Sequence, residues 1–210
     1  MQKHLDVSLK TSYRTLNAFT KETKRVWLVF HGYGQLTEFF IRKFEILDAK
    51  ENFVIAPQGL SKFYLNGFQG RVGATWMTKE DRLVEIENQQ RYIREVFTYE
   101  TKGLDMPELI LFGFSQGVAT LCRFAAYNTI KFDQLVFWAG KFPHDLNPDD
   151  ITHWPENYKL TFFAGDQDQF LNENLIQEER KRLEGLLGKS PTLYTFEGEH
   201  EVKPELLLKI

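Results

Sequence analysis

One serine of the sequence lies in a pattern that could make it a nucleophile. Ser115 is the centre of G-F-S-Q-G at residues 113–117, between the apolar run of residues 109–112 and an amphipathic segment. Between a strand and a helix, G-x-S-x-G exposes the serine on a tight turn where larger flanking side chains would collide. The helix that begins there points its N–H groups and positive dipole at the group under attack. The pattern predicts acyl transfer through Ser115; the alternative is a glycine-rich turn with a helix-capping serine.

A serine hydroxyl is a weak nucleophile, so it needs a base, and the base needs an orienting acid. His200 follows the last apolar run, residues 193–196, where the order Ser…Asp/Glu…His puts the base; the alternative is a surface loop histidine. Asp166 and Asp168 both follow the run of residues 160–164. Residues two apart in an extended segment point the same way, so alternation does not choose between them. Asp166 is suited to capping the turn, whereas Asp168 is placed to reach farther toward His200.

An oxyanion is stabilised by backbone N–H groups rather than by particular side chains. The turn at residues 31–34 (H-G-Y-G) follows the apolar run of residues 26–30, and Tyr33 can offer one such group. Gln116, directly after the serine, can offer the other. His31 is then expected to hold the turn in place and not to act as a base.

These residues require a sheet whose strands end at one edge. Dense apolar runs at residues 26–30, 53–56, 109–112, 135–138, 160–164 and 193–196 predict strands covered on both faces. Helices are predicted at residues 37–48, 79–99, 115–128, 172–187 and 203–210. The alternating segments at residues 5–9 and 13–16 predict an antiparallel pair at the start of the sheet.

This alternation indicates an α/β fold in one domain spanning residues 1–210, without a large cap domain. The central sheet is expected to be mostly parallel, with an antiparallel leading edge and helices on both faces. Residues 57–78 and 141–157 show no regular pattern and follow the carboxyl ends of predicted strands, so we expect them to roof the site as long loops.

Composition excludes several classes of protein. The chain has 210 residues, 42% of them hydrophobic, which is typical of a folded protein, and its 26 Lys and Arg balance 29 Asp and Glu without a basic block for nucleic acid. No run of 18 apolar residues could span a membrane, and the amino terminus lacks an unbroken apolar signal segment, so we expect a cytoplasmic protein. Cys122 is the single cysteine and cannot form an internal disulfide. No spacing typical of a metal or phosphate-binding cofactor site is present, so we expect no metal and no cofactor.

Five aromatic residues lie at the predicted carboxyl edge and could form an apolar wall for an acyl or aryl group: Tyr64, Phe68, Trp76, Trp138 and Phe142. The equally weighted alternative is that half of them belong to the core. Without a cap domain the site is expected to be an open groove.

Together, the G-F-S-Q-G motif, the H-G-Y-G turn, A-G-D-Q-D at residues 164–168 and the late His200 resemble the phospholipase/carboxylesterase group of α/β-hydrolases, which includes the acyl-protein thioesterases. The resemblance covers nearly the whole chain in order and implies a triad of Ser115, Asp168 and His200. The chain departs from the pattern at Ala164 and Val118, and around Trp76, which resembles the family's groove tryptophan.

The resemblance implies hydrolysis of small carboxylic esters or thioesters through an acyl-enzyme on Ser115. Two alternatives stay open: a hydrolase of small peptides, and a ligand-binding protein that retains a hydrolase pocket. We expect no nucleic-acid partner and no stable membrane insertion, and a homodimer stays open beside a monomer.

Overall fold

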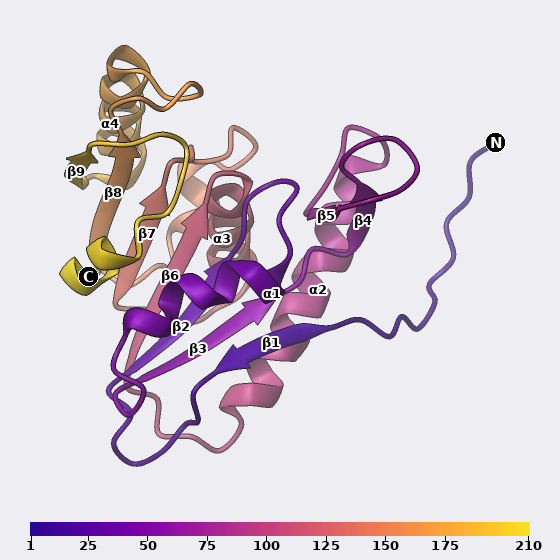
Figure 1. The fold of residues 1–210 in the computed structure, drawn as a ribbon, viewed down its shortest axis with the longest axis horizontal. Coiled ribbons are helices and arrows are strands. Elements are labelled where there is room, and N and C mark those ends of the chain that lie inside the picture. The colour runs from indigo at the N-terminus through magenta and orange to yellow at the C-terminus, as the bar shows by residue number, and fades with distance from the viewer.

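The computed structural model describes residues 1–210 and is built around a seven-stranded sheet in the order β1-β3-β2-β6-β7-β8-β9 (Figure 1). The strands are β1 (Tyr13–Leu16), β2 (Arg25–Phe30), β3 (Asn52–Pro57), β6 (Glu108–Phe114), β7 (Gln134–Trp138), β8 (Lys159–Gly165) and β9 (Thr192–Phe196). Only β1 runs antiparallel to its neighbour, β3. This confirms the prediction of a mostly parallel sheet with an antiparallel leading edge.

Helices cover both faces of the sheet. The α-helices are α1 (Thr37–Phe40), α2 (Arg82–Thr101), α3 (Gln116–Tyr127) and α4 (Glu173–Leu187), and 3₁₀ turns span Ile41–Ile46, Pro148–Ile151 and Pro204–Lys209. Figure 1 shows α1 and the C-terminal 3₁₀ turn on the near face, with α2 and α3 behind the sheet. None of the helices combines the length and the apolar character that crossing a membrane requires.

The apolar runs form strands because both faces of the sheet are covered. All five residues of 26–30 are fully buried, and one continuous core joins the central strands to the apolar sides of α2, α3 and α4. In α2 the buried stripe recurs every three or four residues, as one face of a helix does: Ile86, Gln89, Gln90, Ile93 and Val96.

Two expectations about local structure are wrong. Residues 5–9 form no strand but an exposed arm along α2, where Gln2 donates to Asp81 and Arg91 lies 3.3 Å from Asp6. β1 pairs with β3 instead, so the alternation in the arm meets no neighbouring strand. Residues 57–78 are not an irregular loop, because they contain the hairpin of β4 (Ser61–Tyr64) and β5 (Val72–Thr75).

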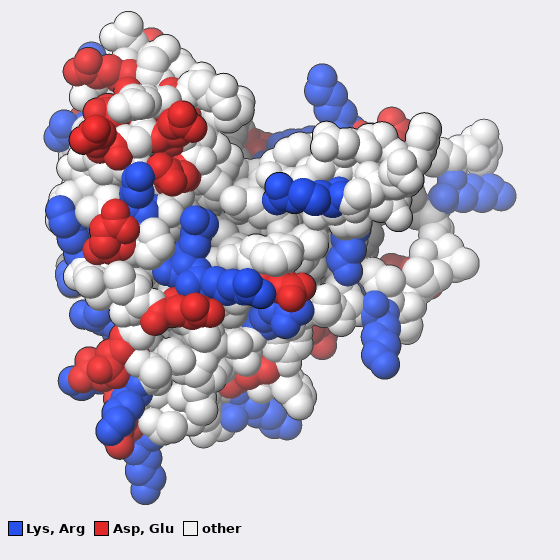
Figure 2. Space-filling view, viewed as in Figure 1, with Lys and Arg blue, Asp and Glu red and all other residues white.

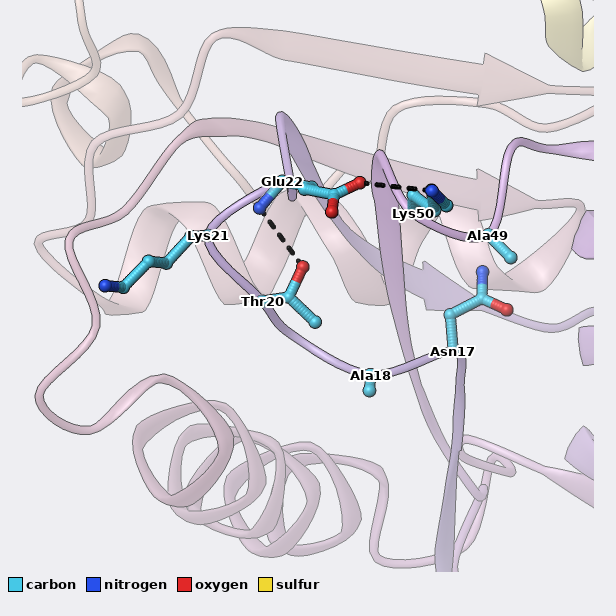
Figure 3. Close-up of a pocket in the computed structure, with 7 residues that line it drawn as sticks. All are labelled: Asn17, Ala18, Thr20, Lys21, Glu22, Ala49 and Lys50. Atoms are coloured by element: carbon cyan, nitrogen blue, oxygen red, sulfur yellow. Dashed lines mark hydrogen bonds and ion pairs between the residues drawn. The ribbon is translucent and has the colours of Figure 1, made fainter.

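The two sheet edges differ in what they carry. At the edge where the parallel strands begin, a hollow lies between residues 17–22 and 49–50 (Figure 3). Its polar contacts are a turn in which the Thr20 hydroxyl accepts from the Glu22 N–H, and a surface ion pair of Glu22 with Lys50. No histidine or cysteine lines it. On the face of the molecule seen in Figure 2, Lys and Arg side chains are interspersed with Asp and Glu.

Candidate active site

Ser115 lies on the turn between β6 and α3, in a backbone conformation that side chains rarely adopt (φ 54°, ψ −118°). The turn is tight because its glycines touch other backbone. A Cβ on Gly113 would lie 2.6 Å from the Val118 backbone, and one on Gly117 would collide with the Phe30 carbonyl. The flanking glycines therefore let the serine leave the sheet at a sharp angle, as the G-x-S-x-G pattern predicts.

His200 reaches this serine from the loop after β9. Its Nε2 lies 2.8 Å from Ser115 Oγ, and its Nδ1 lies 2.6 Å from Asp168 Oδ2. The ring is held between Phe114 and Phe170, at centroid distances of 5.0 and 4.8 Å. Since a carboxylate only accepts, Nδ1 carries the proton and Nε2 is free to accept the serine hydroxyl hydrogen.

Asp168, and not Asp166, contacts His200. The Asp168 carboxylate is completely buried, and its Oδ1 accepts from the N–H groups of Phe170 (2.8 Å) and Leu171 (3.2 Å). Asp166 is exposed and accepts from the Gly198 N–H at 3.0 Å, which ties the turn after β8 to the loop that carries His200. The structure thus separates an orienting carboxylate from a turn-capping one.

The turn after β2 lies beside the serine. Tyr33 is mostly exposed, and its N–H has no hydrogen-bond acceptor in the protein. Gln116 is the first residue of α3, so its N–H has no partner within the helix. Both groups are therefore available as donors, which is the arrangement expected of an oxyanion hole.

His31 is fully buried and fully used. Its Nδ1 donates to the Gly32 carbonyl (2.8 Å), and its Nε2 accepts from the Gly59 N–H (3.0 Å), with the Gln58 amide 3.1 Å away. Burial lowers the pKa of His31 to about 4, so the ring is neutral at physiological pH. This placement agrees with the expectation that His31 holds the turn.

The side chain of Gln116 links three elements of the site, a role that the sequence pattern does not predict. Its Oε1 accepts from the Trp76 N–H (3.1 Å), and its Nε2 donates to the Met77 carbonyl (3.1 Å). Trp76 in turn donates its indole N–H to the His31 carbonyl at 2.8 Å. The start of α3, the end of β5 and the turn after β2 are thereby fixed relative to one another.

The predicted apolar wall needs correction. Trp76, Trp138 and Phe142 are at most 1% exposed, so their rings belong to the core and do not form an exposed apolar wall. Trp76 is held by the hydrogen bonds described above, and Trp138 stacks on Phe163 at 4.3 Å while its indole N–H donates to the Glu201 carbonyl. Phe142 lies in the loop after β7 and packs against Phe137 and Trp154, so it too belongs to the core.

The other two aromatics are exposed on the β4–β5 hairpin, Tyr64 by half and Phe68 almost entirely. The Thr75 end of this hairpin contacts Gln116, whereas Phe68 lies in the loop that joins its strands. Figure 1 shows β4 and β5 at the upper right. Next to His200 the exposed aromatic is Phe170, which the sequence reasoning did not single out.

Outside this cluster, the chain has no reactive thiol and no group of side chains that could hold a metal ion. Cys122 is buried, and desolvation raises the pKa of its thiol well above the usual value. No three His, Cys, Asp or Glu side chains are grouped so that they could hold a metal ion.

Comparison of the sequence with protein-family models and with curated proteins finds no match. Solved structures do match over nearly the whole chain. Zea mays acyl-protein thioesterase 2 superposes with a TM-score of 0.71 and 16% identity over 95% of this chain and 96% of that one. Esterase PE8 gives 0.67 and 19% identity over 96% of each chain, and the Bacillus cereus carboxylesterase gives 0.64 and 16% over 94% and 90%.

The chain has the α/β-hydrolase fold. Identities below 20% carry the likeness at the level of the fold, and at that level they agree with the resemblance found in the sequence.

Proposed function

We propose that the protein is a serine hydrolase that cleaves carboxylic esters or thioesters through an acyl-enzyme on Ser115. One observation carries the proposal: Ser115 Oγ lies 2.8 Å from His200 Nε2, and the same ring is held through Nδ1 by the buried Asp168. A nucleophile, a base and an orienting acid within hydrogen-bond distance are what nucleophilic acyl transfer requires.

The residues have separate tasks in the proposed reaction. His200 takes the Ser115 proton as Oγ attacks the carbonyl carbon, and Asp168 stabilises the imidazolium that forms. The N–H groups of Tyr33 and Gln116 bind the oxyanion. His200 then gives its proton to the leaving alcohol or thiol, and a water molecule activated by the same base releases the acid.

Two further features support esters over a purely binding role. The strained backbone at Ser115 exposes a hydroxyl that a binding pocket would not need in that geometry. The neighbours in fold are named as a thioesterase, an esterase and a carboxylesterase, which favours this class among α/β-hydrolases. A hydrolase of small peptides would use the same groups, so a panel of matched esters, thioesters and amides separates the two.

The proposal is tested with p-nitrophenyl esters of two to eight carbons and matched acyl thioesters and amides. The wild-type protein should turn over esters or thioesters faster than amides, and Ser115→Ala should lower kcat by about 10⁴-fold or more. Ser190→Ala is the matched control, because that hydroxyl accepts only from Arg180 at the surface. Near wild-type turnover by a folded Ser115→Ala, or none by the wild type, would exclude the proposed mechanism.

A further inference from the structure

A second cleft begins beside Ser115 and runs along α3. It has a volume of about 520 Å³, and its lining includes Met77 and Arg82 on one wall, Lys141 and Asp145 on the other, and Ala119 and Arg123 on α3. No part of the acyl-transfer chemistry described above uses these residues. The cleft is large enough for a substrate substituent.

The cleft lies close to the nucleophile along α3. Ala119 and Arg123 lie one and two turns after Ser115, about 6 and 12 Å along the helix axis. Met77 is joined to Gln116 through its carbonyl, and Gly140, just before Lys141, packs against the Ser115 carbonyl. Both walls therefore start at residues that touch the nucleophile turn.

Positive charge dominates this cleft. Its charged lining is Arg82, Arg123 and Lys141 against the single carboxylate Asp145, and the remaining titratable side chain there is the exposed His144. Asp145 accepts from Arg82 (3.1 Å) and from Nε and Nη2 of Arg123 (3.0 and 2.7 Å). Lys141 has no carboxylate within ion-pair distance, so at least one cation is left for a ligand.

Arg123 also has unused hydrogen-bonding capacity. Its side chain is 97% buried, and the partner of its Nη1 is the sulfur of Met77 at 3.7 Å, a weak acceptor. A guanidinium binds oxygen acceptors far better than a thioether. An anionic oxygen in the cleft would thus find a buried donor as well as the free Lys141.

The wall that carries Lys141 is held rigidly from behind. Glu179 accepts from the Phe142 N–H (2.8 Å), and Arg182 donates to the carbonyls of Phe142 (2.8 Å) and Pro143 (3.1 Å). Glu179 is itself paired with Arg182, so its charge does not oppose an anion in the cleft. The backbone beside Lys141 is therefore already ordered, so binding a ligand there costs no ordering of this loop.

We infer that this cleft binds an acidic group of the substrate, a carboxylate or a phosphate, one to two turns of α3 away from Ser115. The inference rests on the proposed hydrolase function and adds a substrate class to it: esters or thioesters with a remote negative charge. The charge can belong to the acyl part or to the alcohol part, and the experiment separates the two.

The experiment compares kcat/KM for two pairs of esters in which a carboxylate is replaced by a neutral carboxamide. The acyl pair is the 4-nitrophenyl monoester of suberic acid and the matching suberic acid monoamide ester; the alcohol pair is the butanoate of 6-hydroxyhexanoic acid and that of 6-hydroxyhexanamide. The wild type should prefer the acid at least tenfold in one pair, which identifies the side. Lys141→Gln and Arg82→Gln should each lower that preference about tenfold, and 0.5 M NaCl should weaken it.

Lys50→Gln is the matched control, since it removes an equal charge from the hollow in Figure 3, at the opposite sheet edge, and should leave both pairs unchanged. If neutral esters are turned over and the acids are preferred less than twofold, the proposed acid-binding role of the cleft is wrong, whereas the proposed hydrolase function is supported. Equal losses on acid and neutral esters in Lys141→Gln and Arg82→Gln would lead to the same conclusion.

If no ester is turned over, the proposed function fails, and the cleft is judged by calorimetric binding of suberate. Binding by the wild type that Lys141→Gln weakens about tenfold, and Lys50→Gln does not, would support the cleft. Equal binding by the wild type and Lys141→Gln, or none, would overturn it.

Discussion

Two histidines lie at the carboxyl edge of the sheet, in turns with opposite properties. His31, after β2, is fully buried, and both of its ring nitrogens are engaged by the Gly32 carbonyl and the Gly59 N–H. His200, after β9, is 17% exposed, and its Nε2 faces only the hydroxyl of Ser115. The same kind of side chain can thus fix a turn, as His31 does, or be placed to move a proton, as we propose for His200. What decides is whether one nitrogen stays accessible to a reacting group.

The largest effect should come from removing the accessible ring. His200→Gln is expected to lower kcat/KM for esters by about 10⁴- to 10⁶-fold, because no other base is within reach of Ser115. His31→Gln should cost far less activity per folded molecule, since His31 touches no reacting atom. Steady-state kinetics on both variants, with the folded fraction checked by circular dichroism, measures the two losses. Similar losses would contradict the different roles assigned to the two histidines.

A smaller loss is expected when the ring at position 200 stays but its partner changes. Asp168→Asn keeps the shape of the site and favours the wrong imidazole tautomer, which in the serine-protease precedent lowers kcat by about 10⁴. The measurement is kcat on an ester whose KM is known for the wild type. A loss below tenfold would mean that Asp168 is not the orienting acid.

The buried ring should show itself in the pH dependence of stability. Burial lowers the pKa of His31 from the usual 6.5 to about 4, so between these values the unfolded chain binds a proton that the folded chain does not. Stability is therefore lost as the pH falls from 6.5 to 4, by about 3 kcal/mol from this group.

Urea unfolding at several pH values tests this, with His31→Asn as the comparison. The variant should be less stable at pH 7, and its gap to the wild type should shrink by up to about 3 kcal/mol near pH 4. A gap that stays constant with pH would contradict a buried, neutral His31.

The smallest effect is expected from the second aspartate. Asp166→Asn weakens one acceptor for the Gly198 N–H, so it should lower the free energy of unfolding by about 0.5–2 kcal/mol, the range for a lost cap, with kcat changed only a few-fold. Thermal denaturation and ester kinetics on the same sample measure both. If Asp166→Asn lost more activity than Asp168→Asn, the two carboxylates would have to exchange roles.

The sequence could predict those parts of the site that depend on local pattern. The glycines beside Ser115 are required by steric contact, so G-x-S-x-G is visible without any tertiary information. The choice of Asp168 over Asp166 depends on which way the loop after β8 bends toward His200. Alternation leaves that open, because both residues follow the same strand; the greater reach of Asp168 and the family resemblance both favour Asp168.

Other features depend on neighbours that the sequence does not reveal. Leu5, Val7 and Leu9 alternate like a strand, but no strand edge lies beside them, so the pattern produces an arm. The apolar patterns do not predict the hairpin of β4 and β5, although Asn66-Gly67 between its strands is a turn signal. Whether an aromatic at a strand end faces solvent or core, as at Trp138, is likewise decided by the loops that cover it.

The central claim is that His200 activates Ser115. Labelling with a fluorophosphonate tests this claim most directly, because the labelling reaction requires no knowledge of the substrate. We expect one phosphonyl group per chain, mapped by mass spectrometry to Ser115. In His200→Gln the labelling rate should fall at least a thousandfold. Labelling elsewhere, or an unchanged rate in folded His200→Gln, would contradict the account.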